Sequence, residues 1–418
     1  MAALDSELGA GWVKSVTPAF APERAVLIDD RWATAREDVA RLGSGETDLD
    51  AFRRLLAPER FVGLGQAVAD HATWWAKQAK ASDLADGAER AAVLTEIAQA
   101  APRTPQAGDA TVRWSEDVAV VTGVAPGSIA AAVVGELLAG GATVVATSSR
   151  LTHERLEFAT TLYREHAAAG AKLWMVPANL SSYRDVDALA EWIGNDQVVT
   201  SGGSTKVVKE ALVPTLLFPF AAPRVSGTLA DAGPAAESQT RLLLWSVERT
   251  IAALSAIGTD THVDHRLHVV LPGSPNRGTF GGDGAYGEVK SALDAIVNRW
   301  SSERAWAQRV TLAHPRIGWV KGTGLMGGND PLVAAVEAAG VRTWTTEEIA
   351  SELTDLCTTE VRTRAAQAPV NADLTGGLGD DIDLVALREN AAAQAAAPTD
   401  ETEAPAVIKA LPTPVVPT

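Results

Sequence analysis

The strongest constraint on the fold is an alternation of short apolar runs with helical segments that begins near residue 117. The runs are, in chain order, VAVVTG, ATVVATS, KLWMVP, LLFPF, LHVVLP and RVTLAH. Each has the length and valine or leucine content of a strand that is buried on both faces. Helical patterns between them cover 151–169, 183–193, 238–257 and 284–304. Such βαβ units predict an α/β fold with a doubly wound, Rossmann-like parallel sheet.

The flanks of this region have a different character. Residues 1–100 carry helical patterns and predict a helical N-terminal extension, and the breakers in APRTPQAGDA predict a linker over 101–116. The main domain is then expected over 117–390. From 391 to 418 the chain is mostly Ala, Pro, Thr and acidic residues, which predicts a flexible tether. Both flanks resemble joints to further domains, as in a single domain excised from a longer polypeptide.

Composition excludes several classes of protein. There are 36 basic and 52 acidic residues, a net charge of −16, which opposes binding to nucleic acid. Cys357 is the single cysteine, so no internal disulfide can form. No apolar run reaches the roughly 20 residues of a membrane helix, and the N-terminus lacks the basic start of a signal peptide. We expect a cytoplasmic protein without a membrane partner.

A glycine-rich turn follows the first expected strand. Gly123 and Gly127 stand at the strand end and the helix start, in TGVAPGSIA. A pyrophosphate needs a tight turn, close approach of the backbone and the positive end of a helix dipole, and this turn supplies all three. Ala130 stands where many such loops have a third glycine. The same pattern also occurs in turns that bind no ligand.

The end of the second expected strand points to the type of dinucleotide. Enzymes that use NAD usually have Asp or Glu there, whereas this strand runs into Ser149 and Arg150 with no acid. Arg150 can pair with a 2′-phosphate through two hydrogen bonds, and Ser149 can donate one more. The pattern favours NADPH. The alternative is that Arg150 is a solvated residue next to the following helix.

A candidate proton donor is found among the three tyrosines of the chain. Tyr286 alone has a lysine four residues later, Lys290, and this spacing places both on one helical face. A phenol has an ordinary pKa of about 10 and is a weak acid unless its anion is stabilised, which a neighbouring ammonium does. Ser274 lies twelve residues upstream after the fifth strand. Its hydroxyl could hold a substrate carbonyl, although serine in such a loop is usually a turn residue.

With these residues the sequence resembles the short-chain dehydrogenase/reductase superfamily, and within it the ketoacyl reductase domain of the type I fatty acid synthases of fungi and actinobacteria. The similarity covers most of residues 117–358. It is carried by VTGVAPGSIAAAVVGELLAGGATVVATSSR, LPGSPNRGTFGGDGAYGEVKSALDAIVNRW and RIGWVKGTGLMGGNDPLVAAVEAAGVRTW. The resemblance implies NADPH-dependent reduction of a 3-oxoacyl thioester on acyl carrier protein to the 3-hydroxyacyl form. The implied partners are this carrier protein and neighbouring domains of a synthase.

The resemblance also implies site residues. Those that match the catalytic positions are Ser274, Tyr286 and Lys290. Those that match cofactor positions are Gly123, Gly127, Ser128 and Ile129 at the pyrophosphate, Arg150 at the 2′-phosphate, Asn179 near the adenine, and Ile317, Gly318 and Thr323 near the nicotinamide amide.

Two features depart from the superfamily pattern. Ser246 occupies the position where an asparagine often completes a proton relay, and Pro219–Pro223 replace the usual Asn-Asn-Ala-Gly. Two alternatives therefore stay open: a free-standing reductase of another ketone or polyketide, and a structural module without catalysis.

Three further signals have ordinary interpretations. His262, His265 and His268 are spaced by three ahead of a strand, where they do not converge, and no thiol is near, so we expect no metal site. Cys357 is expected to be a packed small residue. The glycine-hinged segment 322–330 is expected to be either a substrate lid or a plain loop.

Overall fold

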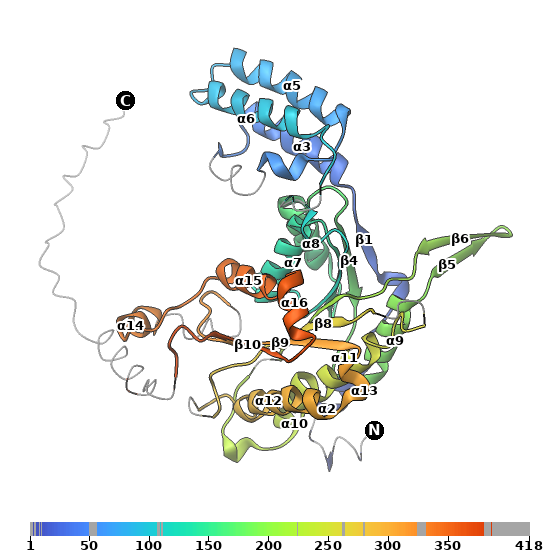
Figure 1. Cartoon of the computed structure of the whole chain (residues 1–418), viewed down its shortest axis with the longest axis vertical. Helices are drawn as coiled ribbons and strands as arrows, with labels where there is room; N and C mark the ends of the chain where they lie inside the picture. Colours follow the sequence, from blue (N-terminus) through green and yellow to red (C-terminus); the bar gives the residue numbers. More distant parts are fainter. Residues whose placement is uncertain are drawn as a thin grey trace, which may run out of the picture.

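The computed structural model describes residues 11–49, 57–106, 112–223, 225–260, 264–278, 281–323 and 332–379, with isolated residues at 3, 6, 7, 9, 109 and 386. The predicted tether over 391–418 lies outside these residues. Figure 1 shows a central sheet with helices on both sides and a separate helical layer built from α3, α5 and α6. No described helix has the length and apolar character needed to cross a bilayer.

The central sheet has eight strands in the order β1-β4-β3-β2-β7-β8-β9-β10. The pairs from β4 to β10 are all parallel, and β1 pairs with β4 in the antiparallel sense. The strands are β1 Val26–Ile28, β2 Val118–Thr122, β3 Thr143–Ser148, β4 Lys172–Pro177, β7 Leu216–Phe218, β8 Leu267–Val270, β9 Val310–Ile317 and β10 Val370–Leu374. The predicted α/β, doubly wound parallel sheet is confirmed.

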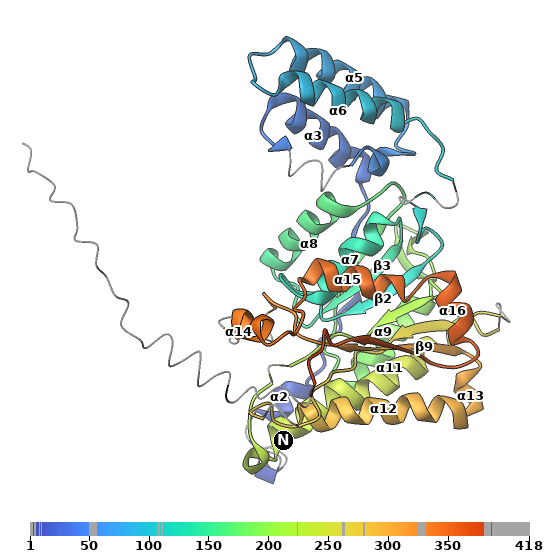
Figure 2. The same ribbon diagram turned by 60° about the vertical axis from the view of Figure 1, so that its left-hand side comes forward.

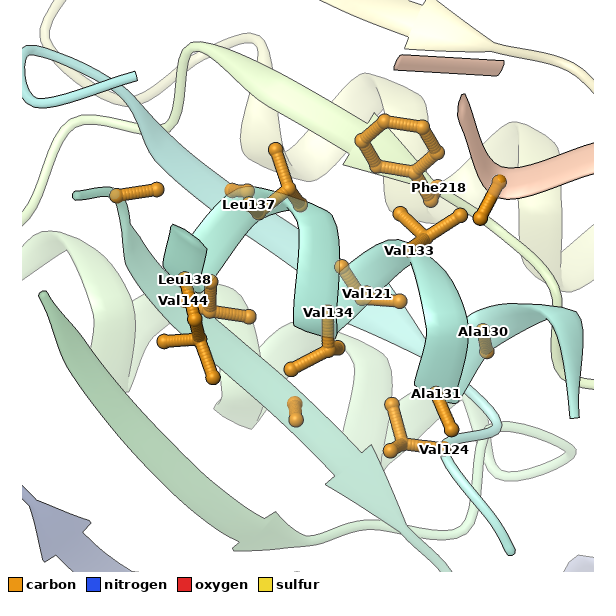
Figure 3. Packing of buried hydrophobic residues seen from close by; sticks show 14 of the residues in the cluster. Val121, Val124, Ala130, Ala131, Val133, Val134, Leu137, Leu138, Val144 and Phe218 are labelled. Carbon is orange, nitrogen blue, oxygen red and sulfur yellow. The ribbon is translucent and has the colours of Figure 1, made fainter. Parts of the chain in front are cut away.

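The sheet separates two hydrophobic cores, because side chains alternate between the faces of a strand. Val121 and Val144 lie in one core, and their neighbours Val120 and Val145 lie in the other. The first core is covered by α7 Ile129–Ala139, α8 His153–His166 and α15 Thr346–Asp355, and the second by α9 Tyr183–Gly194, α11 Ser246–Leu254 and α12 Tyr286–Ser302. Figure 3 shows Val133, Val134 and Leu137 of α7 packed over β2 and β3. Burial on both faces explains why these strands read as continuous apolar runs.

The N-terminal extension is helical as expected but also contains a strand. Its helices are α2 Trp12–Val16, η1 Pro22–Arg24, α3 Arg31–Ser44, η2 Pro58–Phe61, α5 Gln66–Ala81 and α6 Gly87–Ala100. Helices α3, α5 and α6 share a hydrophobic core of their own. Figure 2 shows this layer at one end of the molecule and α2 at the other, beside α12. The three-residue strand β1 was not expected, because a run as short as VLI has no readable period.

Several further elements were not expected from the sequence. A hairpin of β5 Gln197–Ser201 and β6 Ser204–Lys209 projects from the sheet, with Val198 and Val199 more than half exposed. The helical stretch expected over 238–257 is divided by a π-helical turn, η5 Arg241–Trp245. The remaining elements are η4 Leu229–Asp231, α10 Pro234–Thr240, α13 Arg304–Ala307, α14 Val333–Ala338 and α16 Thr359–Ala365.

Candidate active site

The predicted site residues gather at one edge of the sheet, where the parallel strands have their carboxyl ends. Gly123 follows β2, Ser149 follows β3, Ser274 lies four residues after β8, and Ile317 ends β9. Ligands of open α/β sheets bind at this edge, next to the point where the strand order reverses. Here the chain runs from β2 to β3 and β4 on one side and then returns to β7 on the other, so the reversal lies between β2 and β7.

The glycine turn has the backbone geometry that a phosphate site needs. Gly123 and Gly127 have φ angles of 76° and 66°, which residues with a side chain rarely adopt. A Cβ on Gly123 would lie 2.5 Å from the Cα of Ala221, whereas a Cβ on Gly127 would find its nearest neighbour 3.5 Å away. The turn is therefore closed toward the segment after β7, whereas a Cβ on Gly127 would make only an ordinary van der Waals contact with the Gly322 carbonyl oxygen. It leads into α7, whose first residue is Ile129.

Ser128 is the N-cap of α7. Its Oγ accepts a hydrogen bond from the Ala131 amide at 3.1 Å and donates to the Ala125 carbonyl at 2.7 Å. The cap satisfies the Ala131 amide and fixes the direction in which the helix leaves the turn. This arrangement suits a pyrophosphate.

The end of β3 is exposed and carries no acid. Ser149 and Arg150 are both exposed, and Ser148 Oγ donates to the Arg150 carbonyl at 3.0 Å, which shapes the turn after the strand. Within the described part of the chain, Arg150 forms no ion pair. An unpaired guanidinium at this position leaves a free anion-binding group in a chain with a net charge of −16.

Ser274, Tyr286 and Lys290, the three residues predicted to be catalytic and called the catalytic trio below, lie together. Tyr286 begins α12 and Lys290 lies one turn further, with its Nζ 5.4 Å from the centre of the Tyr286 ring. The same Nζ donates to the Pro272 carbonyl at 2.6 Å, so the buried ammonium is held between the loop after β8 and the tyrosine. The spacing in the sequence and the turn of the helix thus place both side chains on one face.

The local environment shifts the pKa of two members of the trio. Burial raises the pKa of Tyr286 to about 12, and a hydrogen bond with Ser274 opposes this rise, while the charge of Asp283 adds to it. Burial lowers the pKa of Lys290 to about 8. The pKa of Tyr286 rises overall because the loss of hydration of the phenolate outweighs the hydrogen bond with Ser274.

Asn276 holds the loop that carries Ser274, a role that the sequence did not reveal. Its side chain is 7 % exposed, and its Nδ2 donates to Asp283 Oδ2 at 2.6 Å. Its Oδ1 accepts from the Gly278 amide at 3.0 Å, and its backbone amide donates to Ser274 Oγ at 3.1 Å. One buried amide therefore connects the serine loop to the start of α12. The only signal in the sequence was its place two residues after Ser274.

A second buried amide supports the start of α12 from the other side. Gln239 of α10 is 3 % exposed, and its Oε1 accepts from the Ala285 amide at 2.8 Å, directly before Tyr286. Gly287 packs so closely on Gly278 that a Cβ would lie 2.4 Å from the Gly278 amide nitrogen. These contacts fix the position of the tyrosine relative to the serine loop.

Asn179, the residue predicted to lie near the adenine, forms its side-chain hydrogen bonds within the protein. Asn179 donates through Nδ2 to the carbonyls of Ser15 and Thr17, both at 2.8 Å, and its Oδ1 accepts from the Ser181 amide at 3.1 Å. Its amide group is therefore already occupied by the protein at the position expected near adenine.

The end of β9 supplies the three residues expected near the nicotinamide. Ile317 is the last residue of the strand, and a Cβ on the following Gly318 would lie 2.2 Å from the Thr375 carbonyl oxygen. Thr323 is 7 % exposed, and its Oγ1 donates to the Val320 carbonyl at 3.4 Å. Of the segment 322–330, only Gly322 and Thr323 lie among the described residues.

Ser246, expected in place of the relay asparagine, is buried directly after the π-helical turn. Its Oγ has no hydrogen-bond partner among the described residues. It lines a small cavity together with Thr122, Leu180, Pro219, Ala221, Leu242, Val247 and Thr250. The π-helical turn interrupts the regular hydrogen bonds of the helix next to this polar atom.

The described histidines and the cysteine that the sequence analysis singled out form structural contacts. His268 bonds to Thr311 and to the Leu356 carbonyl, and burial lowers its pKa to about 4. His265 bonds to the Pro214 carbonyl, and His262 lies outside the described residues. Cys357 is fully buried. Across the described ranges, no three His, Cys, Asp or Glu side chains are grouped so that they could hold a metal ion.

The chain is similar to part of the fatty acid synthase alpha subunits of fungi. It is 38% identical to the subunit of Candida parapsilosis over 267 residues, 63% of this chain, and 38% identical to that of Saccharomyces cerevisiae over 272 residues, 64% of this chain. For Schizosaccharomyces pombe the identity is 36% over 269 residues. The match covers 14% of the length of each of these relatives. No family model matches the chain.

A solved structure decides the fold. The Pseudomonas aeruginosa RhlG/NADP active-site complex aligns with a TM-score of 0.50 at 20% identity, over 64% of this chain and 98% of that one. The chain has the short-chain dehydrogenase/reductase fold. A short-chain dehydrogenase/reductase from Serratia marcescens aligns with a TM-score of 0.48 at 19% identity. The resemblance to a fungal-type fatty acid synthase is thereby confirmed over 63–64% of this chain, and the fold agrees with it.

Proposed function

We propose that this chain reduces a 3-oxoacyl thioester on acyl carrier protein to the 3-hydroxyacyl form with NADPH, as one step of fatty acid synthesis. The observation that carries the proposal is the juxtaposition of Lys290 with Tyr286, supported by Ser274, at the sheet edge that also bears the glycine turn. The short-chain dehydrogenase/reductase fold and the similarity to fungal synthase subunits support the same conclusion.

The residues at this edge fit a nicotinamide dinucleotide phosphate. Gly127 has no side chain and a left-handed backbone, so the chain can approach a phosphate closely there, and the capped N-terminus of α7 can hold the pyrophosphate. Arg150 and Ser149 can hold the 2′-phosphate, and no acid at the end of β3 repels it. When bound, this cofactor supplies a hydride to the carbonyl carbon of the substrate. The RhlG structure is an NADP complex, and its similarity in fold supports the same cofactor class here.

The chain's own residues then supply position and the proton. Ser274 Oγ donates a hydrogen bond to the substrate carbonyl and fixes it beside Tyr286. With a pKa of about 12, Tyr286 keeps its proton at neutral pH, and it can pass this proton to the alkoxide that hydride addition creates, since an alkoxide is the stronger base. Lys290 is mostly protonated at neutral pH because its pKa is about 8, so its ammonium stabilises the resulting phenolate.

The proposed partners follow from the relatives. The similarity covers 14% of a fatty acid synthase alpha subunit, so we propose that the chain acts next to further synthase domains. The proposal that an acyl carrier protein brings the substrate comes from the resemblance found in the sequence.

The test is a comparison of carriers. Purified chain is assayed by NADPH oxidation with an acetoacetyl group on acyl carrier protein, on coenzyme A and as a free ester. We expect reduction of both thioesters, with the highest kcat/KM for the carrier protein. Equal rates for the free ester and the carrier-bound group would instead support a free-standing ketone reductase. No NADPH oxidation and no NADPH binding in a fluorescence titration would support the structural module.

A further inference from the structure

The N-terminal segment reaches the cofactor edge of the sheet. Strand β1 pairs with β4 in the antiparallel sense, with Val26 opposite Met175 near the carboxyl end of β4. The residues before β1 therefore continue past the end of β4, where the nucleotide half of a dinucleotide is expected to lie in this fold. Figure 1 shows β1 running along β4 at the edge of the sheet.

Side chains of the sheet domain hold this segment in place. Asp185 at the start of α9 accepts hydrogen bonds through Oδ2 from the amides of Ala19 and Phe20 at 2.7 and 2.8 Å, and from that of Asn179 at 2.8 Å. The Asn179 side chain donates to the carbonyls of Ser15 and Thr17. The Asp185 side chain is 1 % exposed and accepts hydrogen bonds from three backbone amides, so it fixes the position of the N-terminal segment. Asn179 thus positions the segment.

The segment brings a second arginine to the end of β3. Arg24 Nη2 donates to the carbonyl of Leu151 at 3.1 Å, one residue after Arg150. Both arginine side chains are exposed, and neither forms an ion pair with any residue of the described ranges. Two arginines without an acidic partner among the described residues thus belong to the same turn after β3, in a chain of net charge −16.

We propose that Arg24 is a specificity-determining residue that binds the 2′-phosphate of NADPH together with Arg150. The proposal rests on the proposed function, and it assigns the N-terminal segment a share in the cofactor site. A guanidinium that keeps one nitrogen on a backbone carbonyl still has donors available for a phosphate oxygen. The N-terminal segment would then supply one of the two arginines by which the site prefers NADPH to NADH.

Binding of 2′,5′-ADP and of 5′-AMP, measured by isothermal titration calorimetry on the full chain, tests this inference without any turnover. The two probes differ by the 2′-phosphate. We expect Arg24→Gln to weaken 2′,5′-ADP about tenfold, which is the size of one charge-assisted hydrogen bond, and to leave 5′-AMP unchanged. Arg24→Lys keeps the charge and should lose about threefold or less. Arg304→Gln, an exposed arginine of α13 beyond the opposite end of α12, is the matched control and should change neither affinity.

The outcomes separate this inference from the proposed function. If Arg150→Gln weakens 2′,5′-ADP and Arg24→Gln does not, the role of Arg24 is overturned while the cofactor site stands. If Arg24→Gln weakens both probes equally, Arg24 only anchors its segment, and the inference is again overturned. If the unaltered chain binds neither probe, the cofactor assignment in the proposed function fails first.

Discussion

The two ends of the proposed site are built in different ways. The proposed catalytic end comes from residues 274–278 and 283–290, which are held by the buried side-chain amides of Asn276 and Gln239 and by the first turn of α12. The nucleotide end is assembled from segments far apart in the sequence, around Arg24, Gly127, Arg150 and Asn179. Its charged groups are exposed. In the proposed function, the reaction that needs fixed distances would thus take place on a locally held element, whereas the charged phosphate would be bound by residues from several exposed segments.

This comparison predicts that changes at the catalytic end reduce the rate without loss of cofactor binding. Tyr286→Phe removes the proton donor, and we expect kcat to fall about 1000-fold. The Kd for NADPH should stay within twofold. Tyr183→Phe, at a partly buried tyrosine on α9, is the matched control and should retain full activity. Steady-state kinetics and a fluorescence titration measure the two quantities. A fall of less than tenfold in kcat would remove Tyr286 from the mechanism.

Ser274→Ala should have the next largest effect. It removes the hydroxyl that holds the carbonyl and also opposes the rise in the Tyr286 pKa, so we expect kcat to fall about 100-fold. The KM should change much less, because the hydrogen bond strengthens as the alkoxide forms. A larger change in KM than in kcat would mean that Ser274 only binds substrate.

The pH dependence of kcat/KM should reflect the loss of a proton from Lys290. Above pH 8 its ammonium loses a proton, the phenolate is no longer stabilised, and kcat/KM should fall about tenfold per pH unit. Lys209 is a useful control, because burial also lowers its pKa to about 8 and it lies on the hairpin. The Lys209→Met variant should still show the fall in kcat/KM above pH 8, whereas the Lys290→Met variant should not show it. A profile that stays flat to pH 10 contradicts the role of Lys290.

At the nucleotide end, Gly127→Ala should weaken NADPH binding about tenfold, since a glycine at this point of the turn lets the backbone approach the pyrophosphate closely. A left-handed backbone also costs about 1–2 kcal/mol of stability. Gly170→Ala controls for this strain, because Gly170 has a φ angle of 84° with nothing within 4 Å and precedes β4 at the opposite edge. Equal effects of both variants on the Kd would show that strain alone is responsible.

Asn276→Ala should have a smaller effect on the rate, because Asn276 acts through the position of Ser274. We expect a decrease of about fivefold in kcat with unchanged KM, and a loss of about 1–3 kcal/mol in the free energy of unfolding from the unpaired polar groups left behind. Asn195→Ala, an exposed asparagine that bonds to the Glu191 carbonyl, is the control. Loss of stability without loss of kcat would mean that the loop does not position Ser274.

The same contrast explains what the sequence could predict. The Tyr286–Lys290 pair was readable because an i, i+4 spacing has one geometric meaning on a helix, and the buried strands were readable as apolar runs. Strand β1 was not, because three residues have no period. The contact between Arg24 and Leu151 joins segments 127 residues apart, and no local pattern records such a contact. The rise in the pKa of Tyr286 was not readable, because it depends on burial, which the spacing of charges in the sequence does not reveal.

The central claim is that the glycine turn and the catalytic trio form one site that transfers hydride to a 3-oxoacyl thioester. Isotope transfer tests it most directly. The chain is incubated with an acetoacetyl thioester and NADPH that carries deuterium on the transferable position of its nicotinamide. The account predicts a 3-hydroxyacyl product with one deuterium on its hydroxyl-bearing carbon, found by mass spectrometry, and almost none with Tyr286→Phe. A product without deuterium, or equal labelling by both proteins, would contradict it.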